Sequence, residues 1–419
     1  MKQTKKGTTL QRLFDNFISL VVLQFINYLL PLFLIPYLIR ILGIDGFGIY
    51  SFVLAMIMYG VQMSDYGFEL SATYHISLNR NNQQKIDEIF SSVLTIKFLI
   101  AFIYLILLTL LSFFIEKLFL YQELIFIAFG TLLGHLLFPL WFFQGVEKMR
   151  YIMYLNGFSK LIFVLSIFLF VKEESDLYLL LLLNSITTIF IGIIALYVAI
   201  TKFNIKFSFQ PWEKLIYYLK DGWYIFTSKF AVEFYTTANI IILGFFATPL
   251  VIGYYAVSIK IVHALGSLLD PLIRTVYPYL VNLYQSSNEN FVTRNKQLAL
   301  VIFIIMLPVA LLVGYYSELI LEIITGKEVM PLNIEILQVF SISLSVYLYG
   351  SQFTNMLVTI KATKILNTIL YITAGLNLLF APILLYLFGV IGMVWFSVFL
   401  AFFLMISKGY YLFVHLKRS

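Results

Sequence analysis

The chain has 419 residues, of which 61% are hydrophobic and only 12% are charged, and its mean hydropathy is +0.93. Because soluble globular chains carry about 25% charged residues, this composition excludes a soluble globule and indicates an integral membrane protein. The chain contains no cysteine, which excludes disulfides, thiolate metal sites and cysteine nucleophiles. A net charge of +7 would suggest a nucleic-acid partner in a soluble protein, but here we expect none, because the placement of Lys and Arg relative to the bilayer explains it.

Apolar windows long enough to cross a bilayer as helices, which takes about 20 residues, follow one another along the whole chain. The first comes after a basic N-terminal segment and has no small-residue cleavage site, so we expect a retained span and not a signal peptide. The sequence therefore predicts an all-α integral membrane protein with twelve transmembrane helices. The windows are 14–39, 48–76, 88–114, 123–145, 150–171, 177–200, 222–247, 250–282, 296–316, 332–360, 365–388 and 390–413.

The distribution of basic residues supports this number of spans. With a cytoplasmic N-terminus, the inner segments hold 18 of the Lys and Arg residues and the outer segments hold 4, namely Arg40, Lys117, Lys172 and Lys327. Such an excess on the inner side is what the positive-inside rule requires. We therefore expect both termini in the cytoplasm.

The longest inner connection lies in the middle of the chain and predicts two lobes of six helices around a central cavity. We expect an N-terminal lobe at 1–200, a cytoplasmic linker helix at 201–221 and a C-terminal lobe at 222–419. In the linker, Trp212, Leu215, Ile216 and Leu219 share one helical face, as in a helix that lies in the membrane interface. A similar turn after the first span (42–51) and after the seventh (243–258) favours a duplicated transporter architecture.

The eighth span carries four ionisable side chains, although each costs about 2.5–3.5 kcal/mol at the bilayer centre. Lys260, His263, Asp270 and Arg274 share one face if 250–282 forms a single helix, which we expect Pro271 to bend. Such a face cannot point to lipid, so we expect it to line a cavity. Alternatively, Asp270 and Arg274, one turn apart, neutralise each other.

Other spans also carry polar residues on one face, which is expected if a wet cavity lies between the lobes. Lys229 and Glu233 form a second possible i,i+4 pair, whereas Lys97 and Lys160 stand alone in their spans. This surplus of cations favours an anionic ligand. The candidate substrate-binding residues are Lys260, Arg274, Lys229, Lys160, Lys97, Gln24, Asn27, Gln352 and Asn355, and the candidates for ion coupling are Asp65, Glu69 and Asp270.

Simpler interpretations of the same residues remain open. Lys408, near the inner end of the last span, would extend to the interface, and the Asn and Gln residues would form hydrogen bonds between helices. No enzyme motif or phosphate-binding loop is present, and the four His residues lack metal-ligand spacing. We therefore predict a transporter without catalytic residues, metal or cofactor, coupled to a gradient of H⁺ or Na⁺.

The segments 23–52 and 63–80 resemble a known family. The runs N-Y-x-L-P-L, P-Y-L-x-R-x-L-G, F-G and D-Y-G-F-x-x-S-A-T occur there in order, as in O-antigen and capsule repeat-unit flippases. These are the Wzx-type polysaccharide transporters of the multidrug/oligosaccharidyl-lipid/polysaccharide superfamily. The sequence FGVIGMVW at 388–395 extends the resemblance towards the end of the chain, whereas Tyr74 stands where the family has Arg.

The resemblance implies a multi-pass protein of the bacterial inner membrane that moves undecaprenyl-diphosphate-linked oligosaccharide to the periplasmic leaflet. Cationic cavity residues, Lys260 above all, would hold the diphosphate, Asn and Gln would meet the sugars, and membrane lipid would surround the prenyl tail. A polysaccharide polymerase complex is a candidate partner. The alternatives are a cation or drug antiporter of the MATE branch and, in another class, a membrane polysaccharide polymerase or ligase. A cationic cavity argues against the first, and the absence of a large outer loop argues against the second.

Overall fold

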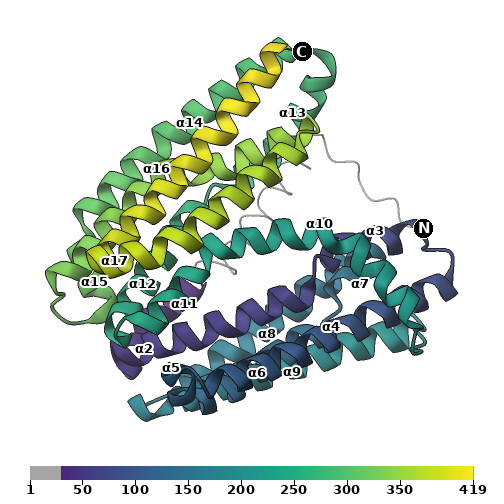
Figure 1. Cartoon of the computed structure of the whole chain (residues 1–419), viewed down its shortest axis with the longest axis horizontal. Coiled ribbons are helices and arrows are strands. Elements are labelled where there is room, and N and C mark those ends of the chain that lie inside the picture. The colour runs from purple at the N-terminus through teal and green to yellow at the C-terminus, as the bar shows by residue number, and fades with distance from the viewer. Residues whose placement is uncertain (1–29, 419) are drawn as a thin grey trace, which may run out of the picture. The chain divides into compact units, whose positions relative to one another are not determined.

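A computed structural model describes residues 30–418, and its secondary structure across them is helical. The chain forms two compact units (Figure 1). Unit 1 joins the chain up to Arg40 with Tyr254–Ser419, and unit 2 is Ile41–Gly253. Two helices, α2 (Leu30–Asp65) and α12 (Pro249–Ser267), pass from one unit into the other. The predicted division into lobes at 201–221 is a different partition and stays a prediction.

Unit 2 is built from long helices joined by short connections, with α4, α6, α8 and α9 running alongside one another in Figure 1. Small residues let α6 and α9 approach closely, since a Cβ on Gly134 would lie 2.6 Å from the backbone nitrogen of Ile189. The remaining helices of the unit are α3 (Phe68–Leu78), α4 (Gln83–Ser112), α5 (Glu116–Leu120), α6 (Gln122–Leu137), α7 (Leu140–Gly145), α8 (Met149–Phe170), η2 (Glu174–Asp176), α9 (Leu177–Lys202), α10 (Trp212–Thr236) and α11 (Ala238–Phe246).

Unit 1 places α16 between α14 and α17. The long helix α17 contains a non-helical residue, Gly389, with a φ of 64° that favours glycine, and Figure 1 shows the chain reversing direction within α17. The helices are α13 (Asp270–Ser286), α14 (Asn288–Tyr315), α15 (Ser317–Thr325), α16 (Pro331–Thr359) and α17 (Thr363–Arg418).

Nine helices in the described part of the chain are long and apolar enough to cross a membrane, or ten if the bent pair α10 and α11 is one span. The expected class, an all-α membrane protein, is therefore confirmed. Two of these helices contain a non-helical glycine, Gly43 in α2 and Gly389 in α17.

The helix ends follow from local sequence chemistry. The side chain of Asn82 accepts a hydrogen bond from the Lys85 amide at 3.1 Å and begins α4. Ser287 begins α14 in the same way, and Pro331 occupies the first turn of α16, where its missing N–H has no cost. Between α6 and α7, Phe138 is extended because Pro139 follows it.

The expected linker helix is not a separate element. Helix α10 begins at Trp212 and runs unbroken to Thr236, so the predicted interfacial segment is the first part of the seventh span. Two side chains of this part, Leu215 and Tyr218, are buried in the core of unit 2, whereas Trp212 is exposed. Hydropathy separated the linker from the seventh span at residue 222, but packing against α3 and α4 joins the two in one helix.

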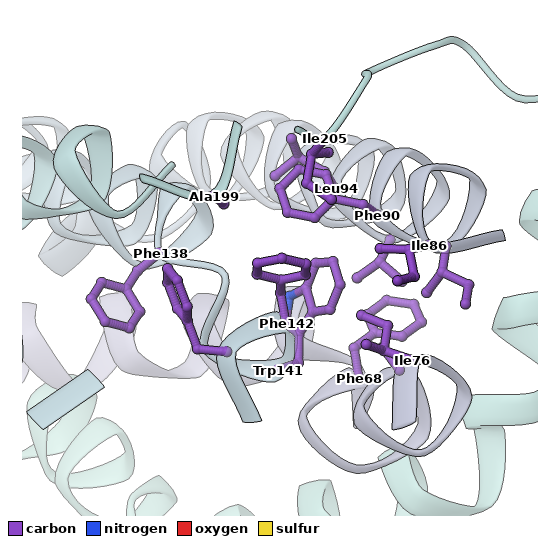
Figure 2. Close-up of a cluster of buried hydrophobic side chains, with 14 of the residues drawn as sticks. Phe68, Ile76, Ile86, Phe90, Leu94, Phe138, Trp141, Phe142, Ala199 and Ile205 are labelled. Carbon is purple, nitrogen blue, oxygen red and sulfur yellow. The ribbon is translucent and has the colours of Figure 1, made fainter. Parts of the chain in front are cut away.

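An aromatic cluster fills the core of unit 2 near the start of α4 (Figure 2). Trp141, Phe142 and Phe143 of the short helix α7 are buried there, and Figure 2 shows Phe142 close to Phe90. The rings of Phe90 and Phe142 meet edge to face, with centroids 5.5 Å apart. This cluster fixes α3, α4 and α7 relative to one another.

Candidate functional site

The second span is broken between the acidic residues Asp65 and Glu69. Helix α2 ends at Asp65 and α3 begins at Phe68, while Tyr66 and Gly67 have φ values of 45° and 74°. A Cβ on Gly67 would lie 2.9 Å from Cβ of Ile225, so glycine suits both the backbone and the space there. The break turns the chain between the two carboxylates. The single helical face expected for this span is therefore interrupted.

Helix α10 packs against this break. The ring of Tyr66 stacks on Phe226, with centroids 4.5 Å apart and planes 11° apart. A Cβ on Gly222 would lie 3.1 Å from the carbonyl oxygen of Tyr66, so the absence of a side chain lets α10 approach the broken backbone. This packing brings the polar face of α10 next to α3.

Lys97, expected to stand alone in its span, is paired with Asp65. Its ammonium group donates to Asp65 Oδ1 at 2.6 Å, and the lysine side chain is only 2% exposed whereas that of Asp65 is 41% exposed. The prediction that Lys97 is an unpaired cation is therefore wrong, because its partner comes from another helix. The pair links α4 to the end of α2.

Lys229 is also paired across helices. Its ammonium group donates to Glu69 Oε2 at 2.6 Å, and both side chains are partly exposed. The open alternative of a Lys229–Glu233 pair within the span is therefore not what this structure shows. Instead, Glu233 accepts a hydrogen bond from the Thr237 hydroxyl at 2.6 Å. Glu233 is not among the predicted site residues, and the sequence left open whether Lys229, one turn away, neutralises it.

The stripe predicted in the eighth span belongs to two helices. Lys260 and His263 lie in α12, whereas Asp270 and Arg274 lie in α13, which begins after a break at Leu268 and Leu269. Angles counted along one helix therefore do not carry across the break, which comes directly before Pro271 in the first turn of α13.

Within the described part of the chain, Asp270 and Arg274 form no ion pair with each other within 4.0 Å. Arg274 is exposed and Asp270 is half-buried. The Arg274 charge still acts on the Asp270 carboxyl group, so the alternative in which the two residues neutralise each other stays a prediction. Lys260 is half-buried, and His263 packs against the ring of Tyr347 at 5.7 Å.

The two polar candidates of the tenth span differ in burial: one side chain is buried and the other is half-buried. Gln352 is 1% exposed, and its amide donates to the Asn295 carbonyl oxygen at 3.0 Å, which joins α16 to α14. Asn355 is half-buried. Gln24 and Asn27 lie outside the described residues.

Two further lysines differ from their expected settings. Lys408 does not extend to the interface: it is 4% exposed, and its ammonium group donates to Thr354 Oγ1 at 3.0 Å and to the Gly350 carbonyl oxygen at 3.4 Å. Lys160 is half-buried on α8 and is not an isolated charge. Burial of the Lys408 side chain between α16 and α17 has no signature in the local sequence.

Ion pairs also hold the ends of the helices of unit 2 beside the aromatic cluster. Glu88 accepts from Lys85 and Lys214, each at 2.6 Å, and from the Tyr218 hydroxyl at 3.0 Å. His75 and Asp221 form a further contact at 2.9 Å between α3 and α10. Within residues 30–418, no group of three His, Cys, Asp or Glu side chains could hold a metal ion.

The sequence of residues 13–284 matches the family model described as "Polysaccharide biosynthesis protein". The chain belongs to this family. The matched range contains both acid–lysine pairs and the break between them. It also contains Lys260, Asp270 and Arg274, but ends before α16 and Lys408.

Two relatives of this chain carry the name "Putative O-antigen transporter". The relative from Shigella dysenteriae is 31% identical over 90% of this chain and 94% of its own length. The relative from Escherichia coli K12 is 34% identical over 63% of each chain, so that alignment spans less than two thirds of its length.

Solved transporters share the fold. A lipid II flippase, MurJ in an inward closed conformation, superposes with a TM-score of 0.74 over 94% of this chain and 87% of its own, at 16% identity. A multidrug MATE transporter in an inward-facing conformation gives a TM-score of 0.67 over 93% of this chain and 98% of its own, at 14% identity. The chain thus has the fold of the superfamily to which both belong, and it is a multi-pass membrane protein.

Proposed function

We propose that this protein is a flippase that moves an undecaprenyl-diphosphate-linked oligosaccharide, an O-antigen or capsule repeat unit, from the cytoplasmic to the periplasmic leaflet. The observation that carries the proposal is the 31% identity with a protein named as an O-antigen transporter, over nearly the full length of both chains. The shared fold with a lipid II flippase supports the same kind of activity. The protein is then a transporter of the bacterial inner membrane and not an enzyme.

Twelve spans with both termini in the cytoplasm suit this activity. Non-helical glycines divide α2 at Gly43 and α17 at Gly389. If each part of these helices is a span, and if the broken pairs α10–α11 and α12–α13 each form one span, the number is twelve. The excess of Lys and Arg in the inner segments supports this topology.

To bind the diphosphate, a cation has to be released from any carboxylate that it already holds. Lys97 and Lys229 each hold a carboxylate at 2.6 Å, so binding a phosphate there would have to displace Asp65 or Glu69. Arg274 is exposed, and its charge acts on the Asp270 carboxyl group without a direct ion pair. Since a guanidinium group binds phosphate through two parallel hydrogen bonds, we place Arg274 with Lys260 first among the candidates for the diphosphate. A movement of the two lobes around the site would supply alternating access.

Alanine substitution of Lys260, Arg274, Lys229 and Lys160 tests the proposal. The measured quantity is the lipid-linked oligosaccharide left in the inner leaflet of cells or proteoliposomes. We expect it to accumulate in the K260A and R274A variants. Lys364 provides the matched control, because it is an exposed lysine at the start of α17 and K364A is expected to transport normally.

Transport at the wild-type rate with all four cations removed would refute the cationic site. Absence of lipid-linked oligosaccharide transport by the wild-type protein, with extrusion of cationic dyes in its place, would refute the flippase function itself.

A further inference from the structure

Glu233 is a carboxylate inside a membrane span that has no cationic partner among residues 30–418. It lies in the last turn of α10, immediately before α10 and α11 bend by 45° at Thr237. Among the described residues, no Lys or Arg lies within 4.0 Å of its carboxylate, and its hydrogen bond comes from the Thr237 hydroxyl at 2.6 Å. Lys229, one turn earlier, is held by Glu69.

The tyrosine Tyr59 of α2 faces this carboxylate. Its ring packs against Phe230 and Phe234 of α10, with centroids 5.4 Å and 5.9 Å away. Its hydroxyl is buried, finds no hydrogen-bond partner in the described structure and lies within electrostatic range of Glu233. A buried hydroxyl without a partner is rare, because it loses the hydrogen bonds that water would give.

The other titratable groups near Glu233 do not neutralise it. Tyr104 of α4 lies within electrostatic range of Tyr59 and donates its hydroxyl to the Met56 carbonyl oxygen at 2.6 Å. Tyr235 on α10 is a neutral phenol within electrostatic range. Lys229 is the cation of the same helix, and Glu69 of α3 occupies it. Glu233 is thus surrounded by hydroxyl groups and aromatic rings.

Such surroundings favour exchange of a proton over binding of a metal ion. A carboxylate without a cation is costly in a bilayer span, and a bound proton removes that cost. A metal ion would need several oxygen ligands, whereas the contacts at Glu233 supply one carboxylate and neighbouring hydroxyls. Discontinuous helices in transporters place coupling sites near such bends.

We propose that Glu233 is the proton-carrying carboxylate that couples this transporter to the proton gradient, with Thr237 and Tyr59 as hydrogen-bond donors to its charged form. The proposal rests on the transport function proposed above. Glu233 takes the place of Asp65 and Glu69 as the coupling group, because each of these two residues already holds a lysine at 2.6 Å. Protonation makes Glu233 a donor, changes its bond with Thr237 and thereby acts on the bend between α10 and α11.

The test uses the full-length protein in proteoliposomes with lipid-linked oligosaccharide. With an inward proton gradient of about one pH unit, the steady-state ratio of outer-leaflet to inner-leaflet oligosaccharide should rise up to about tenfold in wild type if one proton is exchanged per substrate. The E233Q variant should lose this response, and E233D should recover part of it. The E213Q variant is the matched control, because Glu213 is exposed at the start of the same helix, and it should respond like wild type.

A second measurement does not depend on transport. Infrared difference spectra recorded between high and low pH should show a protonated carboxyl band in wild type and E213Q that is missing in E233Q. Persistence of this band in E233Q, a gradient response in E233Q, or stimulation by Na⁺ in place of H⁺ would overturn the proposal. If wild-type protein flips no oligosaccharide under any gradient, the transport function fails, while the infrared band still decides whether Glu233 takes up a proton.

Discussion

The pair between Lys97 and Asp65 predicts an asymmetric effect of removing either partner. Substitution D65N leaves an ammonium group that is 2% exposed without a counter-charge, and such a loss costs about 3–5 kcal/mol. We expect D65N to lower the free energy of unfolding by about 3 kcal/mol, at the lower end of this range, because the Asp65 side of the pair is 41% exposed and water can reach the ammonium group from that side.

The reverse substitution should cost less. In K97M the remaining Asp65 carboxylate has access to solvent, and the methionine fills the volume of the lysine stem, so we expect a loss of about 1 kcal/mol, as for exposed pairs. The double variant should cost about 2 kcal/mol and not the additive value of about 4, which gives a coupling energy of about 2 kcal/mol.

The assay is denaturant unfolding of the purified protein in mixed micelles, followed by tryptophan fluorescence. Trp141 is a suitable reporter because it is buried in the aromatic cluster of the same unit. Equal losses for D65N and K97M, with a coupling energy below about 0.5 kcal/mol, would refute the structural pair. Lys97 would then be available for substrate, and K97M would abolish transport.

The remaining predictions concern close packing and the second buried lysine. G48A should destabilise the protein by about 1–3 kcal/mol, because a Cβ there would meet the Pro249 carbonyl oxygen. G67A should do the same because of its positive φ and Ile225. The control G157A should be neutral or stabilising by up to about 1 kcal/mol, since nothing lies within 4 Å of that Cβ. Equal unfolding midpoints for all three glycine variants would contradict these contacts. K408M should leave the unfolding midpoint unchanged or raise it, because burying an amine is costly, whereas a large loss would show that the amine stabilises unit 1.

The positions of ionisable residues inside spans could be predicted from the sequence, but their partners could not. Lys229 has an acid one turn away in Glu233, and helix periodicity made that pair the natural alternative. In the structure it bonds Glu69, 160 positions away in the chain. Lys97 likewise bonds Asp65, 32 positions away. Periodicity describes one helix at a time, whereas these pairs depend on how α3, α4 and α10 pack.

Breaks in helices were also only partly predictable. Pro271 indicated an interruption of the helix near the break between α12 and α13, because proline fits the first turn of a helix and ends the preceding one. The break at Tyr66 and Gly67 has no proline. It depends on a left-handed backbone at two successive residues that packing against Ile225 and Phe226 stabilises.

The sequence by itself determined the membrane class, the helical fold and the family, because hydropathy and motif order are properties of residues taken along the chain. It also located the charges that a bilayer makes costly. Only the tertiary structure decided which of these charges are neutralised. Lys97 and Lys229 found carboxylates on other helices, Lys408 was buried between α16 and α17, and Glu233 kept only a hydroxyl. The physical reason is that ion pairs in a low-dielectric interior are set by distances between helices, which no local pattern encodes.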